Sequence, residues 1–234
     1  QYELSTITLH RRTKIQQVTL YIANFLYLCG ENFDNMTKSV NPAAGVSTPD
    51  FPKTERQFDK AIGECRQVFA SKLRDYGASW RLMRPTAVTD QILIKADRIR
   101  SLETKGESKV DEPVDDAFRA IVNYGIIGLI QLRLGYADRK DISPEEALEM
   151  YDREMGATRE VMLAKNHDYN EAWRKMRVSS YTDLILMKLM RTKEIEDNLG
   201  HTEVSEGIDA NYQDMINYAL FGLIKLGEEA QAGA

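Results

Sequence analysis

The feature that most constrains this chain is an internal duplication. The stretch KLRDYGASWRLMR, residues 72–84, returns as KNHDYNEAWRKMR at residues 165–177. Between residues 75–98 and 168–191, twelve of twenty-four positions are identical. A repeat of this length marks a structural unit, and such units commonly cover each other's apolar faces. We therefore expect two similar lobes that pack together.

Each repeat is predicted to form three helices. In the first repeat, residues 54–74 carry apolar side chains at helical spacing. In the second repeat, Ser143-Pro144-Glu145-Glu146 supplies an N-cap, a proline at the first helical position and a capping-box glutamate. These signals predict that the first helix of each repeat leads into the repeated Asp-Tyr-x-x-x-Trp motif.

The other two helices follow from caps and stops. The second helix is expected to begin at Thr89-Asp90 or Thr182-Asp183 and to end at Gly106 or Gly200. The third is expected to begin near Glu112-Pro113 in one repeat and near Glu206-Gly207 in the other, with the linker at residues 135–142.

No segment shows the period-two alternation typical of a strand. We therefore predict an all-α fold: two tandem three-helix repeats packed as a pseudo-twofold helical bundle. The predicted domains are repeat 1 at residues 51–134 and repeat 2 at residues 144–227. They follow a partly flexible N-terminal extension at residues 1–50.

The N-terminal region allows two interpretations. A basic stretch precedes an apolar run, Val18 to Cys29, in the order of a signal peptide, but no small-x-small cleavage site follows. The run is also shorter than the roughly 20 residues that span a bilayer. Alternatively, residues 1–35 are an upstream extension and Met36 is the natural start. We expect a cytoplasmic protein with no membrane partner.

Composition limits the function classes. The formal net charge of −5 argues against a broad basic surface for duplex nucleic acid, although local basic patches leave nucleic acid open as a partner. The two cysteines and three histidines show no zinc spacing. Structural zinc is not expected, and the low cysteine content fits a reducing interior.

Polar residues repeated in both copies are the candidates for a site. On the second helix, Lys95 and Arg98 recur as Lys188 and Arg191, with the lysine inside the apolar sector of the helical wheel. Such a lysine either extends along the core to reach solvent or offers its ammonium to a phosphate. Both interpretations stay open.

The third helix supplies carboxylates. Glu112 and Asp115 recur as Glu206 and Asp209, and an i, i+3 pair on one helical turn would point its oxygens the same way, which a six-coordinate Mg²⁺ can use. Acidic residues at a helix start are also favoured by the helix dipole alone. The copies differ nearby, because Asp116 aligns with Ala210 and Ala120 aligns with Asp214. We include Asp116 and Asp214 among the candidate metal ligands.

The remaining candidates could read a base or sugar, or could be structural. Asn123 and Asn217 are expected on the carboxylate side of the third helix, where an amide could bind a base or tie the helix to a carbonyl. The tryptophans are more often core anchors than stacking platforms. The aromatic candidates are Tyr76, Trp80, Tyr169 and Trp173.

Taken together, these motifs resemble a known family. The order D-Y-G-x-x-W, then K-x-x-R on a helix, then an acidic helix start and N-Y, is similar to the nucleotide modification associated domain of type 1, found in phages and bacteria. The resemblance covers both repeats. It implies a role in nucleotide metabolism or in nucleotide or DNA modification.

A more distant likeness is to the all-α nucleoside triphosphate pyrophosphohydrolases of the MazG-like group, which hold Mg²⁺ with E-x-x-E and E-x-x-D helices. Glu112-x-x-Asp115 and Glu206-x-x-Asp209 fit the second motif, but Lys95-x-x-Arg98 stands where the first would be. This likeness implies Mg²⁺ as a cofactor and sites built between packed helical units.

Three functions therefore stay open. The first is a Mg²⁺-dependent, pyrophosphohydrolase-like enzyme whose lysines and arginines hold phosphates. The second is a non-catalytic module that binds a nucleotide or nucleic acid. The third is a helical scaffold whose repeated polar residues are caps and braces. A nucleotide is the expected partner, and further self-association into a homo-oligomer is left open.

Overall fold

The computed structural model describes residues 50–110, 112–204 and 206–233. Within these ranges the chain forms six α-helices and two short 3₁₀ helices, and no strand. This confirms the predicted all-α class. The elements are α2 (Phe51–Tyr76), η2 (Ser79–Leu82), α3 (Pro85–Lys105), α4 (Val114–Leu134), α5 (Pro144–Tyr169), η3 (Ala172–Lys175), α6 (Val178–Asp197) and α7 (Ile208–Ala232). The predictions for residues 1–49 lie outside the described residues.

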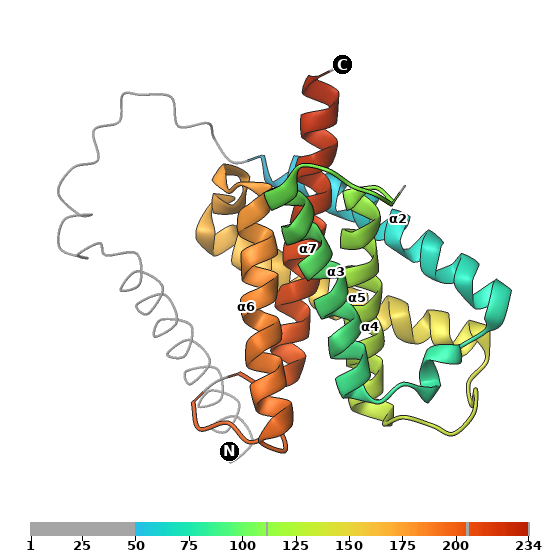
Figure 1. Cartoon of the computed structure of the whole chain (residues 1–234). Coiled ribbons are helices and arrows are strands. Elements are labelled where there is room, and N and C mark those ends of the chain that lie inside the picture. The colour runs from blue at the N-terminus through green and yellow to red at the C-terminus, as the bar shows by residue number, and fades with distance from the viewer. Residues whose placement is uncertain (1–49, 111, 205, 234) are drawn as a thin grey trace, which may run out of the picture. The chain divides into compact units, whose positions relative to one another are not determined.

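Helices α3, α4, α6 and α7 form an upright bundle, and α2 and α5 cross it (Figure 1). Helices α4 and α7 pack against each other, α3 packs on α4, α6 packs on α7, and α3 also contacts α6. Helix α2 contacts α5, and each of these also contacts both α4 and α7. Each of these helix packings between the repeats is matched when the repeats are exchanged, which is the arrangement of a twofold dimer on one chain.

Glycines allow α4 and α7 to approach closely. A Cβ atom added at Gly128 would lie 2.6 Å from the Tyr212 ring, and one added at Gly222 would lie 3.0 Å from the Phe118 ring. Gly128 aligns with Gly222, and Phe118 aligns with Tyr212. Each helix therefore sets an aromatic ring against the glycine of its partner, and only a residue without a Cβ leaves that space.

Surface ion pairs repeat the same symmetry. Arg66 Nε lies 2.6 Å from Asp152 Oδ1, and Arg159 Nε lies 2.6 Å from Asp59 Oδ1. Arg66 aligns with Arg159 and Asp59 with Asp152, so the two contacts are one contact made twice. This reciprocity supports the predicted pseudo-twofold relation.

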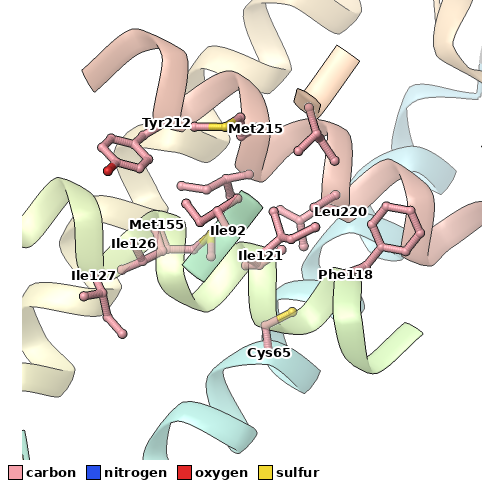
Figure 2. Close-up of a cluster of buried hydrophobic side chains, with 14 of the residues drawn as sticks. Cys65, Ile92, Phe118, Ile121, Ile126, Ile127, Met155, Tyr212, Met215 and Leu220 are labelled. Carbon is pink, nitrogen blue, oxygen red and sulfur yellow. The ribbon is translucent and has the colours of Figure 1, made fainter. Parts of the chain in front are cut away.

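The core lies between the central helices. Phe118 and Ile121 of α4 meet Met215 and Leu220 of α7, and Cys65 of α2 approaches from below in the view of Figure 2. All of these side chains are fully buried. Helix α4 is long and apolar enough to cross a membrane, but most of its apolar window is buried inside the bundle, as is typical of a core helix.

The repeated Trp-Arg pair explains why the chain carries the motif twice. Trp80 and Trp173 are buried, and the Trp173 ring stacks on the Phe221 ring with the ring centroids 4.4 Å apart. The arginines that follow tie elements together. Arg81 donates to Asp141, Gln131 and the Gly135 carbonyl, whereas Arg174 donates to Thr54, Gln57 and Glu228. Arg81 thus ties the first repeat to the linker, whereas Arg174 ties the second repeat to α2 of the first.

Two predicted helix starts were wrong. Helices α3 and α6 begin at Pro85 and Val178, about one turn before the predicted threonine caps. Thr89 lies inside α3, where its hydroxyl contacts Glu196 at 2.7 Å, so it serves the interface instead of a cap. By contrast, the capping box at Ser143 is confirmed.

Candidate functional site

In the second repeat, a buried carboxylate lies between two lysines. Lys188 of α6 is almost fully buried, and its Nζ lies 2.6 Å from Asp214 Oδ2 on α7. Lys165 at the end of α5 places its Nζ 2.5 Å from the other oxygen, Asp214 Oδ1. Burial opposes ionisation of Asp214, but the charges and hydrogen bonds of the two ammonium groups outweigh it and lower its pKa. The negative charge at this point is therefore firmly held.

The equivalent place in the first repeat has no carboxylate of its own. Ala120 aligns with Asp214, while Lys72 and Lys95 align with Lys165 and Lys188. Lys95 Nζ instead lies 2.9 Å from Glu112 Oε1. Glu112 stands before α4, and its side chain is about one third exposed.

Arg98 completes this cluster. Its Nη2 donates to the Glu112 carbonyl at 2.5 Å, and its Nε lies 3.7 Å from Glu112 Oε2. Its Nη1 is buried and has no hydrogen-bond partner among the described residues. The hydrogen bond from Lys95, together with the positive charges of Lys95, Arg98 and Lys72, lowers the pKa of Glu112. Three cations therefore act on one carboxylate here. We call Lys72, Lys95, Arg98 and Glu112 the basic cluster.

Comparison with known protein families identifies the family of this chain. The family described as nucleotide modification associated domain 1 matches residues 72–132 and again residues 165–226, together more than half of the chain. The chain belongs to this family. No curated protein and no solved structure matches it.

The two matched domain copies contain the clusters described above. The first matched range holds the basic cluster, and the second holds Lys165, Lys188 and Asp214. The copies therefore share their lysines, whereas the carboxylate between the lysines occurs in the second copy alone.

The predicted pair of Glu112 and Asp115 on one helical turn was wrong. Helix α4 begins at Val114, with Pro113 as its N-cap, so Glu112 precedes the helix and turns toward α3. In the second repeat, α7 begins at Ile208, and Glu206 likewise precedes it. Proline and glycine at the cap positions separate the two carboxylates, so they do not share a helical face.

The other candidate metal ligands of the first repeat are paired with an arginine. Arg119 contacts Asp115 and Asp116, each at 2.7 Å. Within the described residues, no group of three or more His, Cys, Asp or Glu side chains is placed to hold a metal ion. The described side chains as placed therefore do not form a Mg²⁺ site by themselves.

The second repeat keeps its remaining candidates apart. Arg191 is exposed, and Glu206 and Asp209 are exposed at the start of α7. No ion pair joins Arg191 to Glu206 among the described residues, although the aligned Arg98 and Glu112 do meet. The second repeat thus does not reproduce the basic cluster.

The candidate asparagines lie inside the fold. Asn123 donates to the Cys65 carbonyl at 3.1 Å and accepts from the Tyr151 hydroxyl at 2.9 Å. Asn217 donates to the Thr158 carbonyl at 3.3 Å. Both amides tie a central helix to a crossing helix, and the expected position of Asn123 away from the apolar side was wrong.

The aromatic candidates divide by exposure. Trp80 and Trp173 belong to the core, and Trp173 Nε1 donates to Asn166. Tyr76 and Tyr169 are 46% and 42% exposed and remain accessible at the ends of α2 and α5.

Sequence reasoning missed Lys72 and Lys165. Both stand at the first position of the repeated motif, so their repetition was a visible signal. The acids on which they act, Glu112 before α4 and Asp214 on α7, lie dozens of residues away along the chain, and only the fold brings them near the lysines.

Proposed function

We propose that this chain binds a nucleotide by its phosphate groups at the basic cluster of the first repeat. The observation that carries the proposal is the exchange of Asp214 for Ala120. In the second repeat, the buried Asp214 lies between two lysines. In the first repeat, Ala120 stands at the aligned position, and the carboxylate near the aligned lysines is the partly exposed Glu112. A phosphate supplies what a carboxylate supplies, negative oxygens that accept charge-assisted hydrogen bonds.

Arg98 gives the cluster a donor for such an oxygen. One of its nitrogens is already fixed on the Glu112 carbonyl, which holds the guanidinium in place. The buried Nη1 has no hydrogen-bond partner in the part of the chain that the structure describes, and it can donate to a ligand without breaking a contact there. A guanidinium held in this way suits phosphate recognition better than a freely rotating side chain would.

The family relationship supports a nucleotide as the source of the phosphate, because the matched domain is associated with nucleotide modification. The general association is a property of the family, and the binding is our proposal. Turnover of a nucleoside triphosphate, and Mg²⁺ as its cofactor, stay predictions that the same binding experiment addresses when it is repeated with Mg²⁺ and the products are analysed.

The test places a carboxylate in the first repeat. The change Ala120→Asp reproduces the arrangement of Asp214, and Ala120→Asn is the matched control of equal size without charge. Nucleotide affinity is measured by calorimetric titration with a panel of nucleoside and deoxynucleoside triphosphates. We expect Ala120→Asp to weaken binding at least about tenfold, equivalent to about 1.4 kcal/mol. Ala120→Asn should change it much less.

Removing a cation from the basic cluster should also weaken nucleotide binding. Lys95→Ala should weaken binding by roughly 10–100-fold, the range expected for a hydrogen bond to a charged group. The proposal is wrong if wild-type protein binds no nucleotide in the panel, or if Ala120→Asp binds as tightly as Ala120→Asn.

A further inference from the structure

A groove lies on the side of the first repeat, between α2, the start of α4 and the end of α7. It has a volume of about 470 Å³, which is within the usual range for small-molecule sites. Its apolar wall includes Ala61, Val114, Leu223 and Ile224. Its polar groups include Gln57, Glu64, Asp115, Arg119 and Glu228. The groove therefore combines an apolar surface with several hydrogen-bonding groups.

Small residues keep the groove open. Ala61 on α2 aligns with Glu154 on α5, and Gly227 on α7 aligns with Arg133 on α4. At the place related by the pseudo-twofold, between α5 and the end of α4, those larger residues meet, with Arg133 Nε 2.9 Å from Glu154 Oε1, and the glutamate is buried. An ion pair between the repeats thus occupies that place, whereas alanine on α2 and glycine on α7 stand at the aligned positions in the groove.

The same repeat therefore lacks an internal carboxylate at two places. Ala120 replaces Asp214 in the basic cluster, and Ala61 replaces Glu154 in the groove. Two charged groups of the groove are also found in the first repeat alone, since Glu64 aligns with Ala157 and Arg119 aligns with Gln213. The first repeat therefore has a smaller, uncharged side chain at both alanine positions.

The groove and the basic cluster differ in the charges that they present. Glu64 and Asp115 both lie on Arg119, at 3.6 and 2.7 Å from its Nη2, and Glu228 accepts from Gln57 at 2.8 Å. Carboxylate oxygens repel a phosphate, but they accept hydrogen bonds from base amines and sugar hydroxyls. The basic cluster suits the phosphates, and the groove suits an uncharged part with an apolar face.

We propose that the groove holds the nucleoside part of the nucleotide whose phosphates bind at the basic cluster. This inference rests on the proposed function. The two places adjoin along the chain, because Asp115 lines the groove and Glu112, three residues earlier, belongs to the cluster. Three residues of chain span at most about 11 Å. A nucleotide bound across the start of α4 reaches both places.

The test fills the groove with the ion pair of the other repeat. The double change Ala61→Glu, Gly227→Arg is compared with wild type and with Ala120→Asp. Each protein is titrated with a nucleoside triphosphate and with inorganic tripolyphosphate, which lacks the nucleoside. We expect the double variant to bind the nucleotide at least tenfold more weakly and tripolyphosphate within twofold of wild type. Ala120→Asp should weaken both ligands.

Folding of each variant is checked by circular dichroism. If the double variant does not fold, Gly227→Arg alone is used, because residue 227 is exposed and an added Cβ there meets no atom within 4 Å. Gly156→Arg, on an exposed and equally open site of α5, controls for an added arginine.

The outcomes separate the two proposals. If the groove variants bind the nucleotide as wild type does while Ala120→Asp weakens it, the groove inference is overturned and the proposed function stands. The groove inference is also overturned if the groove variants weaken both ligands equally. If wild type binds neither ligand, the proposed function fails and the groove inference fails with it.

Discussion

Asp214 shows how one residue can decide the role of a repeat. Its carboxylate is buried beside the Lys188 ammonium and also accepts a hydrogen bond from the Lys165 ammonium. A buried pair of this kind is stable only while both partners remain, because an unpaired charge in the interior is very unfavourable. Ala120, at the aligned position of the first repeat, carries no charge and needs no partner of opposite charge.

This arrangement predicts a strong effect of removing the charge. Asp214→Asn leaves the Lys188 ammonium buried without a carboxylate, so we expect the free energy of unfolding to fall by about 3–5 kcal/mol. The double change Asp214→Asn, Lys188→Met removes both charges and should recover most of this loss. Urea unfolding measures both. Equal stability of the single and double variants would contradict the assignment.

The lowered pKa of Asp214 predicts a loss of stability in acid. Because the folded-state pKa lies below the ordinary aspartate value of about 3.9, the contribution is complete above that value and is lost as the pH falls through the folded-state pKa. Wild type should therefore lose more unfolding free energy than the Asp214→Asn, Lys188→Met variant between neutral pH and about pH 3. Urea midpoints across this range provide the measurement, and parallel curves would refute it.

At the scale of elements, the close approach of α4 and α7 depends on glycine. A Cβ at Gly128 would meet the Tyr212 ring at 2.6 Å, and the ring is fully buried and has no free space to enter. We expect Gly128→Ala to cost about 1–3 kcal/mol, the usual range for overpacking. Gly156→Ala in α5, where an added Cβ meets nothing, should instead stabilise the helix by roughly 0.5–1 kcal/mol. Thermal unfolding compares the two.

Sequence reasoning predicted the elements better than their contacts. Apolar spacing and the capping box at Ser143 gave the helices and the repeat order, because these signals are local. The start of α3 was missed, since Pro85 began the helix one turn before the more familiar threonine cap. Asn123 was placed on the wrong side of its helix, because a crossing helix covers a face that one helical wheel treats as exposed.

The candidate site was predicted only in part. Lys95, Arg98 and Glu112 were identified from their repetition, and the structure brings them together. The lysine pair around Asp214 depends on the distance between α5, α6 and α7, which no local pattern contains. The groove depends on Ala61 and Gly227, and small residues give no functional signal in a sequence.

At the scale of the whole molecule, both repeats belong to one compact unit, residues 49–234. The short connection between α4 and α5 makes their association intramolecular, which corresponds to an effective concentration of about millimolar for a short linker. Cutting this connection with an inserted protease site should leave the halves associated but should make the melting temperature depend on protein concentration. The uncut chain should melt at a constant temperature across the same dilutions, and a concentration-independent cut protein would contradict the prediction.

The pairing of Gly128 with Tyr212 and of Gly222 with Phe118 has a further consequence. In a dimer of identical subunits, every substitution appears twice, so a change that empties one pocket must empty its mirror image and a brace cannot be kept on one side alone. Here each half is encoded separately. One repeat can therefore keep a structural ion pair while the other evolves a binding site, and the contact between α4 and α7 holds the two repeats in a fixed relation.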